Sequence, residues 1–478
     1  MEPQKSLLWH EKLAKCFSLP QRHIVALLFF TATFNTHTHI AMLSTTLPEM
    51  VTRSNITLKF NVTEICESFN TSLKPPIENP TLVYDYSEHI QGIILSSFYW
   101  GFVTTYVPGA FFNDELANKY IFGLAVLGST ICTLVIPCII FLEHKNWRML
   151  IALRVLAGLF EGIVFPAMDS MYQHWIPPTD RITLSVIRTS GGLSGTIFSF
   201  LLGGLLISAT EIWSSVFYIF GSLGIAWFCF WQLLGYSRPK HNPFLTTAEK
   251  SYIENNLKNR EKRSWKKIPW GKVSASVPFW MLILGEIGHN WGWYLMMTQL
   301  PRYLKTILNF TTKETAYCSA LPFCFYWFWS GVFGHMFDLF LKTEYVSLTT
   351  LRKTFCVVGA LGSGIFMLLV SYAACDGKAV VAWFTVAMSF MSAHSVGVKV
   401  TVHDLSPTYG GSLIELVDGF GNISGMMVPY FVGLIVNHQS IHEWRYVFWI
   451  SFFAYATASF GFLIFGTAEV APWDPLFK

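Results

Sequence analysis

The chain has 478 residues, of which 52% are hydrophobic and only 13% carry a charged side chain. Soluble domains carry about 25% charged residues, so this composition excludes a disordered chain and argues against an ordinary soluble enzyme. The net charge of +4 is small and forms no basic stripe on a soluble module, which argues against a nucleic-acid partner. The nine cysteines show no metal-ligand spacing, so no metal site is predicted. Cys66 and Cys375 lie outside the apolar runs and are candidates for a disulfide bond.

Twelve apolar stretches follow one another along the chain, six on each side of a polar central segment. A membrane-spanning helix needs about 20 predominantly apolar residues, and each stretch is long enough. The stretches are 23–48, 90–112, 120–142, 148–173, 184–208, 213–236, 278–300, 316–341, 354–373, 378–402, 411–436 and 444–467. We therefore predict an all-α membrane protein with two six-helix halves, 23–236 and 278–467.

The distribution of lysine and arginine predicts how the chain is oriented in the membrane. Four basic residues precede the first span, and the central loop 237–277 carries ten basic residues against three acidic ones. Basic segments stay on the cytoplasmic side. We therefore expect the N-terminus 1–22, the central loop and the C-terminus 468–478 to be cytoplasmic, with one amphipathic helix from Thr246 to Leu257 in the loop. The segment 49–89 is then an outer loop.

Candidate glycosylation sites fall on the predicted outer side. Asn55, Asn61 and Asn70 begin N-x-S/T sequences in the outer loop, and Asn309 begins another after the seventh span. Asn422 begins a fifth inside the eleventh span, where we expect no modification.

Two repeated halves are typical of secondary transporters, which bind their cargo near the membrane midplane between the halves. No phosphate-binding loop of the Walker type is present, so an ATP-driven pump is unsupported. No H-E-x-x-H or G-x-S-x-G sequence is present either, so nothing supports an enzyme. No cofactor is expected beyond a coupling ion, H⁺ or Na⁺.

Several motifs resemble those of the major facilitator superfamily. Gly334 to Asp338, followed by Arg352, resembles its cytoplasmic G-x-x-x-D loop. The matching loop after the second span is degenerate, with acidic residues where an arginine is usual. The longer pattern R-x-L-x-G-x-x-E-G from Arg154 to Gly162, followed by W-x-P-P-x-D-R from Trp175 to Arg181, is similar to the anion:cation symporter branch. That branch includes sialin, vesicular glutamate transporters and sodium–phosphate cotransporters.

The resemblance implies roles for charged residues in the fourth span. An ionisable side chain at the midplane costs about 2.5–3.5 kcal/mol, so a span that carries one usually has a partner or a task for it. Arg154, Glu161 and Asp169 lie along one broad stripe, which we expect to face a cavity. By resemblance, Arg154 binds the cargo and Glu161 carries the coupling proton. Asp169 replaces a histidine of sialin-like relatives and is a second candidate for proton coupling. The alternative is a structural ion-pair network.

Histidines in the first and seventh spans are further candidates. His37 and His39 stand where the family usually has R-x-N, and only one of them can face a cavity, because residues two apart point about 200° from each other. His37 could bind an anion as a pH-dependent cation, since histidine titrates near pH 6.5, or it could be a neutral hydrogen-bonding residue. In the seventh span, Glu286 is a candidate for proton coupling, and His289 and Asn290 for cargo binding. Glutamate-specific relatives have arginine at the His289 position, which disfavours glutamate as cargo.

Lys399, Glu415 and Asp418 are charges without counterparts in the family. We expect Lys399 to pair with one of the two carboxylates, with snorkelling to the cytoplasmic surface as the alternative. Five acidic residues against two permanent cations inside the spans would also accommodate a zwitterionic cargo, or an anion that binds only when carboxylates are protonated.

The sequence thus predicts a major facilitator transporter that carries a small organic anion with protons, as sialin-like relatives imply. Its partners would be this anionic or zwitterionic solute and the lipid bilayer. Sodium-coupled phosphate or organic-anion cotransport is one alternative, and a non-transporting membrane receptor on the same fold is another. A lysosomal or vesicular membrane and the plasma membrane are both open as locations.

Overall fold

The computed structural model describes residues 20–51, 84, 86–112, 117–142, 146–177, 179–257, 268–343, 345–373 and 375–477. These residues form helices and no β-strand, apart from a single bridge between Val51 and Tyr84, so the predicted all-α class is confirmed. Asn55, Asn61, Asn70 and Cys66 lie outside the described residues. Cys375 takes part in a disulfide bond.

Each predicted span corresponds to one helix, except that the tenth consists of three consecutive helical elements and the eleventh of two. The first half contains α2 (Gln21–Met50), α3 (Glu88–Phe111), α5 (Lys119–Leu142), α6 (Trp147–Trp175), α7 (Arg181–Thr210) and α8 (Ser214–Leu234). The second half contains α11 (Val277–Thr306), α12 (Thr312–Lys342), α13 (Leu348–Ala373), α14 (Gly377–His394) with η5 (Ser395–Lys399) and α15 (Thr401–Leu405), α16 (Gly410–Gly421) with α17 (Ile423–Ile435), and α18 (Ile441–Phe465). Among the described residues, eight helical segments are long and apolar enough to cross a membrane, and one of them, Gly377–Leu405, joins α14, η5 and α15.

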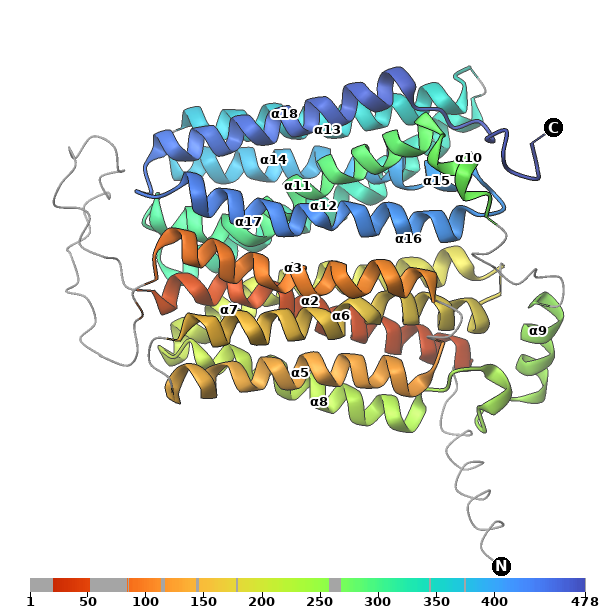
Figure 1. Ribbon diagram of the computed structural model, residues 1–478, viewed down its shortest axis with the longest axis horizontal. Helices are drawn as coiled ribbons and strands as arrows, with labels where there is room; N and C mark the ends of the chain where they lie inside the picture. The colour runs from red at the N-terminus through yellow and green to blue at the C-terminus, as the bar shows by residue number, and fades with distance from the viewer. Residues whose placement is uncertain are drawn as a thin grey trace, which may run out of the picture.

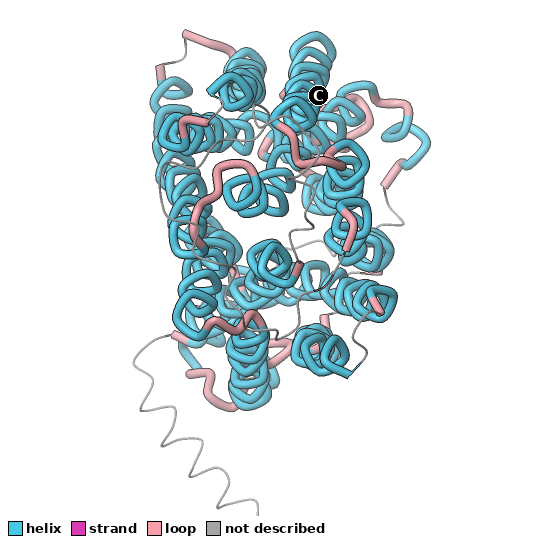
Figure 2. The backbone as a smooth tube through the Cα atoms, turned by 90° about the vertical axis from the view of Figure 1, so that its left-hand side faces the viewer, coloured by secondary structure: helices cyan, strands magenta, loops and turns pink. Residues whose placement is uncertain are grey.

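The helices lie roughly parallel and form two groups, one from each half of the chain (Figure 1). Figure 2 shows the same bundle with the helices seen end on. Within the first half α2 packs against α7 and α3 against α6, and within the second half α13 packs against α14 and α18. The halves meet where α3 contacts α16 and α17, α7 contacts α12, and α2 contacts α11.

Two predicted spans are broken where the sequence suggested continuous helices. The tenth span changes from α14 to the π-helical turn η5 before it ends in α15, and Lys399 is the last residue of that turn. The eleventh span divides at Asn422 into α16 and α17. A π-helical turn rotates the following side chains relative to a regular helix, and such turns are frequent at functional sites. Both breaks lie in the second half, close to the boundary with the first.

The first part of the central segment folds back on one end of the first half, and its last helix packs against α11 of the second half (Figure 1). It contains η3 (Pro239–His241), the predicted amphipathic helix as α9 (Thr247–Leu257), and α10 (Trp270–Ser274). Glu249 of α9 accepts hydrogen bonds from the backbone N–H groups of Gln21 and Arg22, which begin α2. Arg22 also pairs with Asp180, at 3.0 Å from Nε to Oδ2. We call this end of the bundle the α9 end, and the opposite one, where α3 begins, the Glu88 end (Figure 1).

Candidate functional site

A cavity of about 510 Å³ lies between the two halves. Its walls come from α2, α3, α6 and α7 of the first half and from α11, η5, α15 and α16 of the second. The lining residues of α7 lie in its first four turns, those of α16 extend over its turns from Gly411 to Asp418, and those of α6 lie in its last turns. These turns are all at the α9 end, so the cavity runs from the middle of the bundle toward that end.

Aromatic side chains form much of the wall. Phe102 packs edge-to-face on Phe165 with 5.9 Å between ring centroids, and Tyr106 lies 6.3 Å from the same ring. On the other side Tyr99 of α3 contacts Tyr294 of α11, with 4.7 Å between ring centroids. Tyr294 donates a 2.5 Å hydrogen bond to Oδ1 of Asn422, where the eleventh span breaks. Such a wall suits a cargo with an apolar or planar body.

The first half contributes one ion pair to the cavity. Asp169 of α6 and Arg188 of α7 are in contact, with side chains that are 26% and 18% exposed. Sequence analysis selected Asp169 but missed Arg188, because this arginine lies close to the start of its span, where a basic residue is ordinary. Its position could have revealed it, because Arg188 lies one turn inside the predicted span 184–208 and not among the residues that precede the span.

The second half contributes a cluster around Lys399. Nζ of Lys399 lies 2.9 Å from Oδ1 of Asp418 and 4.0 Å from Oε1 of Glu286. The predicted lysine–carboxylate pair is therefore present, with Asp418 as the partner, and Lys399, Glu415 and Asp418 all line the cavity. Glu286 also lies 3.9 Å from Nε2 of His394, a residue that sequence analysis did not select. Asn290 lines the cavity as expected.

His289 occupies a different place from the one its predicted role requires. It is buried and stacks on His394, with 4.5 Å between ring centroids and 10° between ring planes, and it is not among the residues that line the cavity. Its neighbour Asn290 does line the cavity, because successive residues of a helix point about 100° apart.

The two histidines of α2 point to opposite sides, as their spacing requires. His37 lines the cavity, and its Nδ1 lies 3.4 Å from the hydroxyl of Thr196 on α7. His39 is buried away from the cavity, with Nδ1 3.5 Å from Oε1 of Glu161. Glu161 also accepts a hydrogen bond from Ser129 of α5. Among the described contacts, Glu161 is therefore bound by polar groups of two neighbouring helices.

Arg154 and Glu161 do not line the cavity in this conformation, so the expectation that the whole stripe of α6 faces it is not met. Arg154 is 2% exposed, donates a 3.4 Å hydrogen bond to the carbonyl of His39, and lies over the ring of Phe98, itself a lining residue. The reason is close helix packing. A Cβ at Gly158 would lie 2.0 Å from the carbonyl of Phe98, so α3 covers this part of α6.

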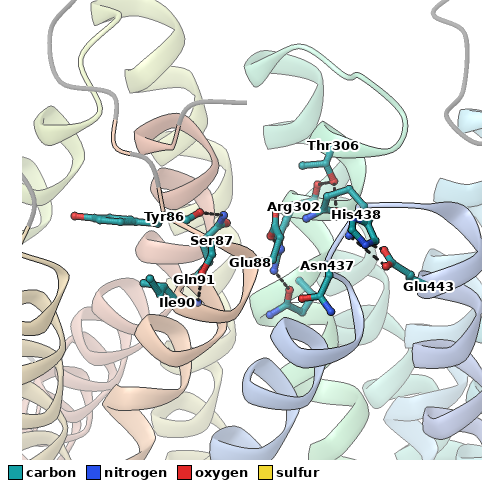
Figure 3. A network of polar contacts seen from close by, with 12 residues as sticks. Tyr86, Ser87, Glu88, Ile90, Gln91, Arg302, Thr306, Asn437, His438 and Glu443 are labelled. Carbon is teal, nitrogen blue, oxygen red and sulfur yellow. Dashed lines mark hydrogen bonds and ion pairs between the residues drawn. The ribbon is translucent and has the colours of Figure 1, made fainter. Parts of the chain in front are cut away.

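Ion pairs between the halves close the Glu88 end. Glu88 of α3 contacts Arg302 of α11, and Glu49 of α2 contacts Lys305 of α11. Figure 3 shows Glu88 and Arg302 facing each other across the boundary between the halves. Thr312 of α12 donates a further hydrogen bond to Glu49 at 2.5 Å. Sequence analysis placed these residues near span ends and did not select them.

The backbones of the two halves also approach closely near this end. A Cβ added at Gly92 of α3 would lie 2.6 Å from the carbonyl of Pro429 and 2.9 Å from Cα of Gly433 on α17. Only glycine allows this contact. The structure is thus closed at the Glu88 end and hollowed toward the α9 end. Within the described residues, no three histidine, cysteine, aspartate or glutamate side chains gather in a way that could hold a metal ion.

Comparison with known proteins places this architecture in a family. Residues 25–414 match the family model described as Major Facilitator Superfamily. Human sialin is 31% identical over 453 residues, which cover 95% of this chain and 90% of sialin. Mouse vesicular glutamate transporter 2 is 30% identical over 471 residues, which cover 96% of this chain and 76% of that protein.

Solved structures show the same fold at lower sequence identity. A bacterial homolog of the human lysosomal transporter Spinster, in an inward-facing and occupied conformation, has a TM-score of 0.66 and 14% identity, covering 94% of this chain and 97% of that one. A D-xylose–proton symporter has a TM-score of 0.64 and 12% identity, covering 94% and 99%. The chain therefore belongs to the major facilitator superfamily, within its anion:cation symporter branch, and is an integral membrane transporter rather than an enzyme.

Proposed function

We propose that the protein carries small organic anions across a membrane together with protons, by alternating access between its two halves. The observation that carries this proposal is the cavity at their boundary, which contains a permanent cation from each half, Arg188 and Lys399. Each cation is held by a carboxylate of its own half. A carboxylate of the cargo could replace these internal partners and so contact both halves at once.

The names of the relatives support the same class of cargo. Sialin and the vesicular glutamate transporters align with this chain over 95% and 96% of its length. His289, where glutamate-specific relatives have an arginine, disfavours glutamate itself. The aromatic wall and the acidic groups favour an organic acid over inorganic phosphate, because phosphate has no apolar surface for such a wall to cover.

We assign proton coupling to carboxyl groups at the boundary and behind it. Glu161 is 1% exposed and lies beside His39 of α2 and Ser129 of α5, so it is buried among polar groups of neighbouring helices. Asp169 and Glu286 line the cavity, with side chains that are 26% and 4% exposed. Uptake of a proton by these groups would lower the negative charge that an anion meets there.

The arrangement of open and closed ends supports alternating access. The pairs Glu88–Arg302 and Glu49–Lys305 join the halves at one end, while the cavity extends toward the other. Rocking of the halves would break these pairs and open the Glu88 end, which we expect on the outer side from the distribution of basic segments. Arg154 would take part in cargo binding only in a conformation in which the ring of Phe98 moves aside.

The test is uptake by the purified full-length protein in liposomes. An acid-outside pH gradient is imposed without sodium, and labelled sialate, glucuronate, benzoate, urate and phosphate are offered in turn. We expect accumulation of an organic acid that stops when a protonophore collapses the gradient. Glu161→Gln should abolish gradient-driven accumulation, whereas Arg148→Gln, a change at an exposed arginine at the start of α6, should leave it unchanged.

Other outcomes would overturn the proposal in distinguishable ways. Accumulation that needs added sodium would identify a sodium-coupled cotransporter. If a labelled zwitterionic amino acid, offered in the same assay, accumulates and none of the anions does, the cargo class would change. No flux of any solute from protein that is folded by its thermal melting curve would favour a receptor on the same fold.

A further inference from the structure

Arg188 and its partner Asp169 are placed differently from Arg154, the buried arginine of α6. Both side chains line the cavity, whereas Arg154 is buried behind Phe98. Arg188 is therefore the permanent cation that a solute entering the first half of the cavity can reach in this conformation. His37 also lines the cavity, but it is charged only when protonated.

The surroundings hold the guanidinium of Arg188 in place and leave part of it available. The carbonyl of Arg188 accepts a 2.9 Å hydrogen bond from Thr33, which ties α7 to α2. The guanidinium lies 5.1 Å from the ring centroid of Tyr172. Its Nε is buried and has no hydrogen-bond partner among the described residues, while the side chain as a whole is 18% exposed. A guanidinium that protein groups satisfy only in part is suited to a bidentate contact with a carboxylate.

Asp169 occupies the place that such a carboxylate would take. Its contact with Arg188 satisfies the arginine without cargo. The charged groups that line the cavity include Arg188 and Lys399 as permanent cations, against the carboxyl groups of Asp169, Glu286, Glu415 and Asp418. His37, His403, Tyr99, Tyr106, Tyr172 and Tyr294 are the other titratable residues that line it. With all four carboxyl groups ionised, a cargo anion would enter a cavity of excess negative charge, which repels it.

We propose that Arg188 binds the carboxylate of the cargo, and that Asp169 is an internal counter-ion which must take up a proton before the cargo can replace it. This rests on the proposed function and adds the group that binds the anion. Proton and anion are then taken up together: the proton neutralises Asp169, and the cargo carboxylate replaces it on Arg188. On release the cargo leaves, Asp169 loses its proton, and the ion pair forms again.

The wall beside the pair indicates what the rest of the cargo resembles. Phe165 lies one helical turn before Asp169 on α6, so their side chains share a face, and Phe102 and Tyr106 pack against its ring. A carboxylate bound to Arg188 would place its body against these rings. The cargo class is therefore an organic monocarboxylate with a planar or apolar body, for which benzoate is a simple probe, and gluconate is a matched polyhydroxylated carboxylate.

The experiment measures binding and transport of benzoate by the full-length protein. Affinity is measured between pH 5 and pH 8 in detergent, and uptake and counterflow are measured in liposomes. The variants are Asp169→Asn, Arg188→Gln, Arg188→Lys and the double variant Asp169→Asn/Arg188→Gln, with Arg148→Gln as the control. The double variant is included because Arg188→Gln alone leaves Asp169 without its cation and could fail to fold.

For the wild-type protein we expect benzoate affinity to fall as pH rises, by up to about tenfold per pH unit once Asp169 is ionised. Asp169→Asn should bind benzoate with an affinity independent of pH, exchange it in counterflow, and lose gradient-driven accumulation. Arg188→Gln and the double variant should lose about tenfold or more in affinity at every pH. Arg188→Lys should recover part of this loss, and gluconate should bind more weakly than benzoate.

Three results would overturn the inference. They are pH-dependent binding that persists in Asp169→Asn, wild-type affinity in the double variant, and equal affinities for gluconate and benzoate. If the wild-type protein accumulates another organic acid and these variants do so equally well, the proposed function stands and this inference fails. If the wild-type protein neither binds nor transports any organic anion at any pH, both fail.

Discussion

The ammonium group of Lys399 lies 2.9 Å from Oδ1 of Asp418, and the two residues come from different spans of the second half. The lysine ends the π-helical turn η5, and the aspartate lies in α16 before the break at Asn422. Both irregular spans therefore contribute a charge to the same cavity. The first half has an equivalent arrangement in Asp169 and Arg188, so each half contains a cation held by a carboxylate of its own.

Removing only one member of the Lys399 pair should destabilise the protein. Lys399→Ala leaves Asp418 and Glu286 close together without a cation, whereas Lys399→Ala/Asp418→Ala removes one charge of each sign. We expect the single variant to melt several degrees below the wild-type protein and the double variant to recover most of that loss, with transport absent in both. Melting is followed by tryptophan fluorescence. Normal transport by the double variant would show that the pair is only structural.

The ion pair between Glu88 and Arg302 should hold the Glu88 end closed. Glu88→Gln removes the charge on α3 and should raise the fraction of molecules open at that end. The probe is Met297→Cys, which introduces a thiol into the cavity wall. We expect a membrane-impermeant thiol reagent, applied from the Glu88 end, to label this cysteine several-fold faster when Glu88→Gln is also present. The exchanged pair Glu88→Arg/Arg302→Glu should return labelling to the slow rate. Equal rates in all three backgrounds would exclude this pair as a gate.

Close approach of α3 and α17 requires glycine at position 92. In Gly92→Ala the new methyl group would lie 2.6 Å from the carbonyl of Pro429, so the halves cannot close fully at this end. We expect transport to fall several-fold, with faster labelling of the same cavity cysteine. Gly331→Ala is the matched control, because a Cβ at this position of α12 meets nothing within 4 Å. Transport losses of equal size in both variants would indicate a general effect on helix stability.

The C-terminal segment after α18 should detach from the bundle in acid. Burial raises the pKa of Asp474, but hydrogen bonds from Ser406, the backbone N–H of Leu476 and Thr408 outweigh it and hold the pKa below the ordinary value of about 3.8. Because the folded pKa is depressed, Asp474 stabilises docking of the segment above about pH 3.8, and this contribution is lost as pH falls through the lower folded value.

Pepsin cleavage within 466–477 measures this detachment, with helix content by circular dichroism as the control for global unfolding. In Asp474→Asn, which lacks the charge, we expect faster cleavage that no longer changes over the same pH range. Cleavage of the wild-type segment that rises only together with loss of helix content would contradict the prediction.

Much of the fold could be predicted from the sequence because a membrane imposes a simple rule. Twelve apolar stretches of about 20 residues or more predicted twelve helical spans, and the helices begin and end within a few residues of the predicted bounds. The amphipathic helix of the central loop was also predicted, and begins at Thr247. The breaks at η5 and Asn422 were not, since apolar side chains around a π-helical turn resemble those of a regular helix.

The residues of the candidate site could also be predicted only in part. Pattern and spacing selected Asp169, Glu286, Asn290, Lys399, Glu415, Asp418 and His37, and all of these line the cavity. They also selected Arg154, Glu161 and His289, which are buried outside it, and they missed Arg188, Arg302 and His394. The roles predicted for Arg154 and Glu161 stay predictions.

By itself the sequence determined that the chain is a helical membrane protein of two six-helix halves and that charged residues lie inside its spans. These properties follow from the cost of placing polar groups in lipid, which acts on each segment separately. Only the tertiary structure decided which charges meet. Glycine contacts such as Gly158 on Phe98 bring α3 onto α6 and cover Arg154, while Asp169, about four turns further along, remains open to the cavity. The partner of a charge depends on such packing between helices, and helical spacing within one span carries no information about it.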